Sequence, residues 1–214
     1  MKILEKIEKK SAVVGIIGMG YVGLPLGLAY TAKKINVLGF DLDEKKINQL
    51  NRGKGYLKHI SEEKIKRAVN SGYLKATSDF SRLPEVDAIL ICVPTPLTEH
   101  REPDMSFVEN TAKTIAKYLR KDQLVVLEST TYPGTTDELL LPLFENAGGK
   151  QKFKVGKDFY LAFSPEREDP NNPDFTTAEI PKVIGGITPM CSKVAKALYD
   201  LVIIKTVPVS SARA

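Results

Sequence analysis

The chain contains no tryptophan, two cysteines, two histidines, and no apolar run near the roughly 18 residues that a membrane-spanning helix needs. Cys92 and Cys191 lie far apart, without a Cys-x-x-Cys pair or histidine neighbours, so we expect neither a disulfide framework nor a zinc site. His59 and His100 have polar neighbours and no ligand spacing, and we expect both at the surface. These absences argue against a secreted disulfide scaffold, a membrane-spanning protein and a bound metal.

A strong charge of one sign is also missing. The 31 Lys and Arg residues stand against 26 Asp and Glu residues, and they are interleaved along the 214 positions, so we expect no nucleic acid partner. With 43% hydrophobic and 27% charged residues, the composition is that of a globular protein with a sizeable core. Residues 1–10 are charged and lack the apolar region of a signal peptide, so we expect a cytoplasmic protein.

Short apolar runs alternate with segments of helical periodicity after a charged prefix, residues 1–12, which we expect to be helical. The runs lie at 13–17, 36–40, 86–93, 124–127, 160–163 and 183–184. Because they are continuously apolar in character and do not alternate strictly with polar residues, they are typical of strands buried on both faces. The pattern predicts that residues 13–214 form one α/β domain, a doubly wound, mainly parallel sheet with helices on both faces. Cap residues predict helix starts at Ser106, Thr135 and Thr188.

A glycine-rich segment, Gly-Met-Gly-Tyr-Val-Gly at residues 18–23, lies between the first predicted strand and the next predicted helix. There Gly18 permits a tight turn, Gly20 lets a pyrophosphate approach the backbone, and Gly23 lets helix and strand pack closely. The helix N-terminus offers its positive dipole end and free N–H groups, including those of Tyr21 and Val22, to the phosphates. Isolated matches also occur in ordinary turns, but this placement predicts a dinucleotide site in a Rossmann-type fold.

Asp41 ends the second predicted strand, 18 residues after Gly23. An acid there accepts hydrogen bonds from the adenosine ribose and repels the 2′-phosphate of NADP, so we expect NAD as the cofactor. Asp43 is better explained as the cap of the following helix. Lys46 has two interpretations, a cation that neutralises a cofactor phosphate or a solvated helix charge, and the sequence does not separate them.

Four motifs, in this order and spacing, resemble those of the UDP-sugar 6-dehydrogenase family. They are Gly-Met-Gly-Tyr-Val-Gly-Leu-Pro-Leu at 18–26, Cys-Val-Pro-Thr-Pro-Leu at 92–97, Glu-Ser-Thr-Thr-Tyr-Pro-Gly-Thr-Thr at 128–136 and Ser-Pro-Glu-Arg-Glu-Asp-Pro at 164–170. Arg-Glu-Pro-Asp at 101–104 and Ile-Pro-Lys-Val at 180–183 resemble the UDP-N-acetylglucosamine branch.

The resemblance implies oxidation of a sugar C6 alcohol to a carboxylate in two steps, with two NAD reduced and a cysteine nucleophile that forms a thiohemiacetal and then a thioester. In the family this cysteine lies in a second domain beyond a connecting helix, and the sequence ends before that helix. Cys92 lies in an apolar run and Cys191 lacks a neighbouring base, so we expect both to be structural. The chain is therefore expected to be an NAD-binding domain that is catalytically incompetent alone.

The resemblance also implies roles for residues that follow predicted strands. Thr95 and Thr130 match threonines at the cofactor, and Thr130 also lies near the hydrolytic water. Either could instead be a turn hydroxyl that satisfies local backbone.

Glu166 is expected to position or deprotonate that water, and Arg167 to grip the substrate as a planar donor fork. An exposed loop in which Arg167 pairs with a neighbouring acid is the alternative. Arg101 is a further substrate-binding candidate, although charges in polar loops are more often solvated.

A UDP-sugar partner and a homodimer that meets through the connecting helix are also implied. UDP-glucose and UDP-N-acetylmannosamine are alternative substrates within the family. A hydroxyacid dehydrogenase of the 6-phosphogluconate type shares a similar glycine loop, but the Ser-Pro-Glu-Arg segment argues against it. A stand-alone NAD-binding module without chemistry of its own is a further alternative.

Overall fold

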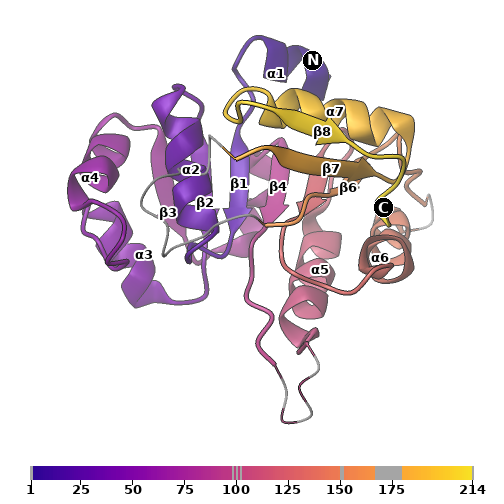
Figure 1. Ribbon diagram of the computed structural model, residues 1–214, viewed down its shortest axis with the longest axis horizontal. Coiled ribbons are helices and arrows are strands. Elements are labelled where there is room, and N and C mark those ends of the chain that lie inside the picture. Colours follow the sequence, from indigo (N-terminus) through magenta and orange to yellow (C-terminus); the bar gives the residue numbers. More distant parts are fainter. Residues whose placement is uncertain are drawn as a thin grey trace.

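Eight strands form one sheet in the structure, a computed structural model that describes residues 2–97, 99, 101, 103–149, 152–166 and 180–213. The strand order is β3-β2-β1-β4-β5-β6-β7-β8 (Figure 1). The strands are β1 Val14–Ile17, β2 Val37–Phe40, β3 Leu74–Thr77, β4 Ala88–Ile91, β5 Leu124–Leu127, β6 Tyr160–Phe163, β7 Lys182–Gly186 and β8 Thr206–Pro208. The helices are α1 Ile3–Glu8, α2 Gly23–Ala32, α3 Glu44–Asn51, α4 Glu62–Asn70, α5 Ser106–Tyr118, α6 Leu141–Glu145 and α7 Pro189–Tyr199, with the shorter helical segments η1 Phe80–Glu85, η2 Thr135–Leu140 and η3 Asn146–Gly148.

The sheet is doubly wound and mainly parallel, as predicted. Strands β1 to β6 are parallel, β7 is antiparallel to β6, and β8 is parallel to β7. The order of the first six strands is that of the Rossmann-type fold. Among the described residues, no helix combines the length and the apolar character needed to span a bilayer.

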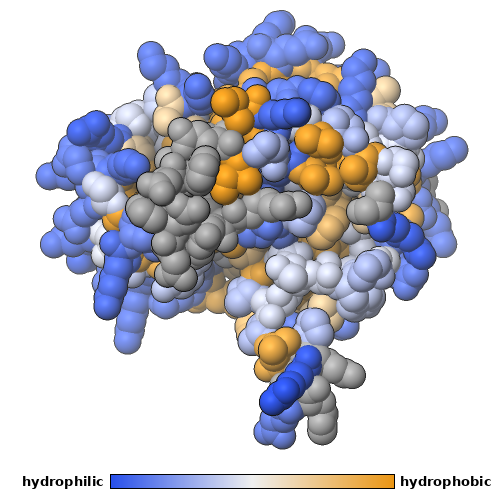
Figure 2. Space-filling model, viewed as in Figure 1, coloured by the Kyte–Doolittle hydropathy of each residue, from blue (hydrophilic) through white to orange (hydrophobic). Residues whose placement is uncertain are grey.

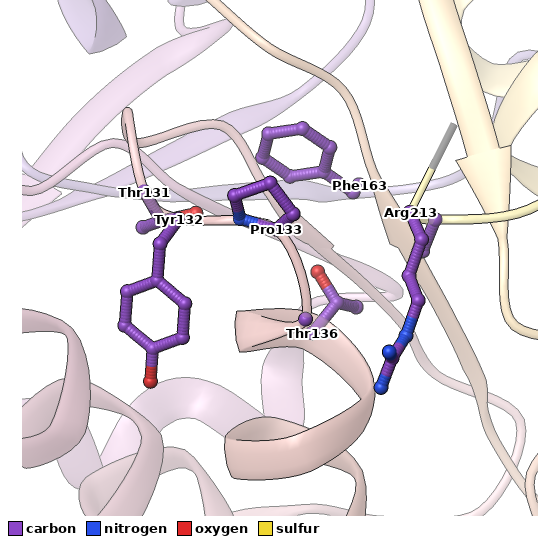
Figure 3. Close-up of a pocket in the computed structure, with 8 residues that line it drawn as sticks. Thr131, Tyr132, Pro133, Thr136, Phe163 and Arg213 are labelled. Carbon is purple, nitrogen blue, oxygen red and sulfur yellow. The ribbon is translucent and has the colours of Figure 1, made fainter.

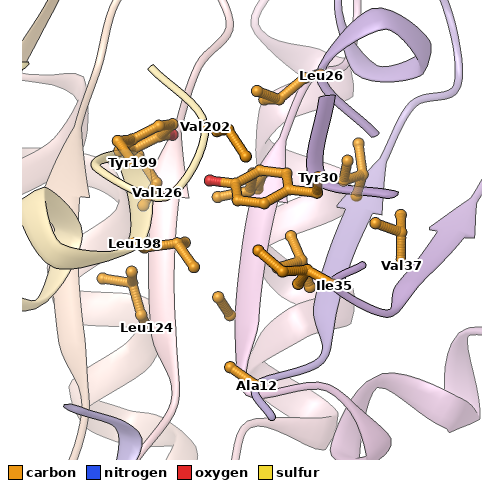
Figure 4. Packing of buried hydrophobic residues seen from close by; sticks show 14 of the residues in the cluster. Ala12, Leu26, Tyr30, Ile35, Val37, Leu124, Val126, Leu198, Tyr199 and Val202 are labelled. Carbon is orange, nitrogen blue, oxygen red and sulfur yellow. The ribbon is translucent and has the colours of Figure 1, made fainter. Parts of the chain in front are cut away.

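Alternate residues of the buried strands pack in two cores, one on each face of the sheet. In β5, Leu124 and Val126 belong to the core built with α1, α2, α3, α4 and α7, whereas Val125 and Leu127 belong to the core built with α5 and α6. Figure 4 shows the first core, where side chains of α2 and α7 meet over the sheet. Because both faces are covered, the strands need continuous apolar sequence.

The apolar pattern does not predict β3 and β8, which form the two edges of the sheet. In β3 buried residues alternate with more exposed ones, and β8 contains Pro208 and is largely exposed. An edge strand has a neighbour on one side alone, so it can form without the run of apolar residues that identifies an inner strand.

The three helical segments begin within one residue of the predicted caps, but of these three caps Thr188 alone forms the side-chain cap bond. The hydroxyl of Thr188 accepts an N–H bond at 3.2 Å in the first turn of α7, as predicted. The sequence also predicts that Ser106 with Glu109 and Thr135 with Glu138 form capping boxes, and this prediction is wrong because neither hydroxyl caps its helix. Ser106 is the first residue of α5, and its N–H donates to Asp104 at 2.9 Å. The hydroxyl of Thr135 donates to the Tyr132 carbonyl at 2.8 Å, and this local hydrogen bond replaces the one that would cap the helix.

A buried carboxylate fastens α1 to the amino ends of the strands, where Figure 1 shows α1 beside α7. Asp87 is 3% exposed and accepts from Lys6 Nζ at 2.6 Å, Arg120 Nη2 at 2.8 Å and the Val13 N–H at 3.0 Å. Burial raises the pKa of Asp87, but these three donors together outweigh burial and hold the pKa below its ordinary value. The domain boundary after residue 12 stays a prediction.

Replacing Asp87 by Asn should lower the free energy of unfolding by about 2 kcal/mol at neutral pH, because Lys6 and Arg120 lose their charged acceptor. Since the folded pKa is lowered, the carboxylate stabilises the fold above its unfolded pKa, and this contribution is lost as pH falls through the folded pKa. The difference between wild type and Asp87→Asn in urea unfolding should therefore shrink in acid.

The matched control is Glu63→Gln. Glu63 pairs with Arg67 at 3.0 Å on the exposed face of α4, and such surface pairs contribute about 0.5 kcal/mol or less. If Asp87→Asn is no less stable than Glu63→Gln at neutral pH, Asp87 does not anchor α1.

Candidate functional site

The loops that carry most of the predicted site residues leave the carboxyl ends of parallel strands. They follow β1, β2, β4, β5 and β6 and carry residues 18–23, Asp41, Thr95, Thr130 and Glu166 respectively. Because these strands are parallel, the five loops share one edge of the sheet. The chain leaves β1 toward β2 on one side and returns as β4 on the other, so this is the switch point where open α/β sheets bind ligands.

The glycine loop has the backbone geometry that its three glycines predict. Gly18 has φ +94°, and a Cβ atom there would lie 2.5 Å from the Cys92 carbonyl oxygen. A Cβ atom on Gly23 would lie 2.0 Å from the Gly18 carbonyl oxygen, so helix α2 starts in direct contact with the loop. A Cβ atom on Gly20 would have no heavy atom of the described chain within 4 Å. Two glycines are therefore needed by the fold, and the third leaves the backbone open to a ligand.

Helix α2 begins without a side-chain cap, so within the described part of the chain no side chain occupies the N–H groups of its first turn. The segment between α3 and α4 supports this loop, because the Tyr56 hydroxyl donates to the Met19 carbonyl at 2.6 Å. The ring of His59 stacks on the ring of Tyr21 at 5.3 Å between centroids. His59 is exposed, as expected, but it also borders the glycine loop. His100 lies outside the described residues.

Asp41 lies beside the glycine loop and already holds three hydrogen bonds. Its Oδ2 accepts from the Met19 N–H at 3.0 Å and from Lys46 Nζ at 2.7 Å, and its Oδ1 accepts from the Asp43 N–H at 3.0 Å. A carboxylate offers about four acceptor positions, so Oδ1 retains one for a ribose hydroxyl. Asp43 caps α3 by accepting from the N–H groups of Lys45 and Lys46, as expected. The structure thus gives Lys46 a partner, the Asp41 carboxylate.

The loops after β4 and β5 are tied together by one hydroxyl. Ser129 is buried and donates to the Val93 carbonyl at 2.7 Å, whereas Thr130 is exposed and Thr95 is half-buried. Thr130 therefore faces away from the packed side of its loop, as alternation along the chain requires. This geometry leaves the Thr130 hydroxyl accessible, and its contact with a cofactor stays a prediction.

A small pocket adjoins the loop after β5 (Figure 3). Thr131, Tyr132 and Phe163 line one part of it, and Arg213 reaches it from the C-terminal segment. Arg213 Nε lies 2.5 Å from Asp137, so an ion pair holds that segment against η2. The pocket therefore depends on the C-terminal segment for one of its walls.

A cluster of buried polar side chains lies at the base of the β5 and β6 loops, and the sequence patterns predict no role for it. Glu128 is 0% and Lys182 is 5% exposed, and Lys182 Nζ lies 2.6 Å from Glu128 Oε2. Tyr199 of α7 donates its hydroxyl to Glu128 Oε1. The available signal was Glu128 itself, a charged residue directly after the fully apolar strand β5.

The two charges of this cluster stabilise each other. Burial raises the pKa of Glu128 above its ordinary value, and Lys182 opposes this shift without cancelling it. Burial favours the neutral form of Lys182, but the carboxylates of Glu128 and Glu166 outweigh burial and raise its pKa. Glu166, half-buried in the segment that follows β6, is therefore an electrostatic neighbour of the cluster.

Arg167 and Arg101, the two predicted substrate contacts, remain. Arg167 lies outside the described residues. Arg101 has φ +62° and lies on a hairpin held by a bridge between Leu97 and Pro103, and this hairpin projects away from the sheet in Figure 1. Figure 2 shows apolar atoms on the hairpin, where Leu97 is 67% exposed. A substrate contact by Arg101 stays a prediction.

Both cysteines are buried, as expected for structural residues. Burial, with help from the charges of Glu128 and Glu166, raises the pKa of the Cys92 thiol well above its ordinary value. The Cys191 sulfur accepts from the Leu161 N–H at 3.3 Å inside the core. Neither thiol has the exposed setting of a nucleophile.

The sequence pattern of the UDP-glucose/GDP-mannose dehydrogenase family, NAD binding domain, matches residues 12–203. The chain belongs to this family. It is 33% identical over 194 residues to a UDP-N-acetyl-D-glucosamine 6-dehydrogenase of Pseudomonas aeruginosa, across 91% of this chain and 44% of the relative. It is 38% identical over 192 residues to a UDP-N-acetyl-D-mannosamine dehydrogenase of Yersinia pestis, across 88% of this chain and 45% of the relative.

Solved structures of relatives have the same fold. An NDP-N-acetyl-D-galactosaminuronic acid dehydrogenase from Methanosarcina mazei superimposes with a TM-score of 0.84 at 34% identity, over 99% of this chain and 47% of that one. A GDP-mannose dehydrogenase from Pseudomonas aeruginosa does so with a TM-score of 0.82 at 26% identity, over 94% and 46%. The chain thus spans less than half the length of these relatives. The resemblance to UDP-sugar dehydrogenases and the NAD cofactor are confirmed.

The geometry fits NAD on three independent points. The open face of Gly20 and the uncapped start of α2 leave room for a pyrophosphate, and Oδ1 of Asp41 keeps an acceptor position that suits a ribose hydroxyl.

Gly20→Ala should leave the fold intact and abolish measurable NAD binding, because the added methyl group meets open space in the protein but blocks close approach of a pyrophosphate. The matched control is Gly27→Ala within α2, where a Cβ atom makes ordinary contacts of 3.4 Å and beyond. Thermal unfolding and calorimetric titration on both variants check this. Gly20→Ala protein that binds NAD normally contradicts the pyrophosphate position.

Asp41→Ser should weaken NAD binding by about ten-fold and strengthen NADP binding, because the variant loses the ribose acceptor and frees Lys46 to pair with a 2′-phosphate. Titration with both cofactors measures the preference. Tighter binding of NADP than NAD by the wild-type chain would contradict the role of Asp41.

Proposed function

We propose that this chain binds NAD across the switch point of its sheet, with adenosine beside Asp41 and nicotinamide beside the loops after β4, β5 and β6. The observation that carries this proposal is the glycine loop, which follows β1 at the switch point and is open at Gly20. Gly18, Tyr21, Val22 and Gly23 supply backbone to the pyrophosphate, and Lys46 stays paired with Asp41 beside the ribose.

For the whole protein we propose oxidation of the C6 alcohol of a UDP-sugar to a carboxylate. When bound, NAD supplies the hydride acceptor. Thr95 and Thr130 hold and orient the nicotinamide half, and the Thr130 hydroxyl also orients the hydrolytic water. Glu166 positions that water and takes its proton, while Arg167 and Arg101 contact the substrate.

The nucleophile of this reaction is not one of the two buried cysteines in this chain. The chain therefore binds cofactor but turns over no sugar nucleotide by itself. Within the whole protein, the part beyond the matched region supplies the cysteine, completes the UDP-sugar site and joins two copies as a homodimer, as the family resemblance implies.

UDP-N-acetylglucosamine is our first candidate substrate, and UDP-N-acetylmannosamine is the second. The motifs at 101–104 and 180–183 support the former, as does the relative with 33% identity. The relative named for the mannosamine sugar has 38% identity, which is the specific observation that keeps the second candidate.

The 214-residue chain should bind NAD with a one-to-one stoichiometry and should produce no absorbance of NADH when UDP-sugars are added. The product of the complete reading frame should reduce two NAD per sugar, with UDP-N-acetylglucosamine preferred over UDP-N-acetylmannosamine and UDP-glucose. Sustained turnover by the 214-residue chain would give Cys92 or Cys191 the role of nucleophile. NAD binding without turnover by the complete product would instead favour a stand-alone binding module.

A further inference from the structure

Burying the charged pair of Glu128 and Lys182 in the core costs free energy. Each charge loses its hydration, and an apolar pair of similar volume is often equally stable or more stable in such a place. Stability alone therefore does not account for the pair. Such a buried pair is explained if it fixes the position of residues that the function needs.

Lys182 contacts the two loops that carry the proposed catalytic residues. Its Nζ lies 2.6 Å from Glu128, which precedes Thr130 by two residues, and 3.4 Å from the carbonyl oxygen of Pro165, which directly precedes Glu166. These loops leave different strands, β5 and β6, so the ammonium group of a third strand, β7, joins them at their base.

Glu128 is held too firmly to shift toward another partner. The Tyr199 hydroxyl occupies its second oxygen, and Lys182 Nζ lies 5.4 Å above the Tyr199 ring. The backbone N–H of Glu128 donates to the Ile91 carbonyl at 2.9 Å, which fixes the residue to the end of β4. Both carboxylate oxygens and the backbone N–H of Glu128 thus have partners, and the cluster connects the ends of β4 and β5 to β7 and α7.

We propose that Lys182 is a positioning residue, whose ammonium group, fixed by Glu128, sets the relative position of Thr130 and Glu166 in the nicotinamide half of the site. The proposal rests on the proposed NAD-binding function. It assigns no role to Lys182 in the adenosine half, which lies at Asp41 and the glycine loop.

The test compares NAD with ADP-ribose, which lacks nicotinamide, by calorimetric titration of the 214-residue chain. Lys182→Met should weaken NAD binding by about ten-fold and leave ADP-ribose binding nearly unchanged, because the loops around nicotinamide lose their fixed spacing. Lys182→Arg, which keeps a cation and donors, should restore a large part of the NAD affinity.

The control for stability is the double variant Glu128→Gln with Lys182→Met. It removes both charges and keeps an acceptor for Tyr199, so its thermal stability should recover relative to Lys182→Met, while its NAD affinity stays low. A double variant that recovers both stability and NAD affinity overturns the proposal, because the pair would then be structural. So does Lys182→Met protein that loses NAD and ADP-ribose affinity in equal measure.

These results separate two failures. A wild-type chain that binds neither NAD nor ADP-ribose contradicts the proposed function and the inference together. A wild-type chain that binds both, with the same ratio of dissociation constants in every variant, contradicts the role of Lys182 alone.

Discussion

Strand β1 pairs in parallel with β2 on one side and β4 on the other, and the cofactor site depends on this placement. Gly18, at its end, packs against the Cys92 carbonyl at the end of β4, and Gly23 packs against Gly18. The loop thus contacts the end of β4 through Gly18 and the start of α2 through Gly23, and neither contact leaves room for a side chain. A change that separates β1 from β4 therefore disturbs both the core and the proposed phosphate site, because the backbone at Gly18 belongs to both.

The inner strands, the glycine loop and Asp41 could be predicted because each leaves a local pattern, an apolar run or a fixed spacing. The edge strands β3 and β8 leave no such run, since their exposed side tolerates polar residues and proline. The cluster of Glu128, Lys182 and Tyr199 joins positions 54 and 71 residues apart. A lone glutamate after an apolar strand does not reveal which residues it will contact. The partners of Glu128 are brought to it when β7 and α7 pack against β5.

The two halves of the proposed site are held by ion pairs of different kinds. On the adenosine side, the Asp41 and Lys46 side chains are 11% and 27% exposed, so salt screens them and Lys46 can move toward a ligand. On the nicotinamide side, Glu128 and Lys182 are out of reach of solvent and weakly screened. Recognition of the nucleotide can therefore adapt, whereas the loops around the reacting ring stay in one place.

The edges of the sheet also have a consequence for the protein in a crowded cell. At one edge, β3 presents the exposed Lys75, and at the other, β8 ends in Pro208, which has no N–H to donate. Charge and proline both discourage a further strand from pairing with an open edge. A parallel sheet of this size exposes unpaired strand edges while it folds. Lys75 and Pro208 therefore lower the tendency of neighbouring chains to aggregate through these edges.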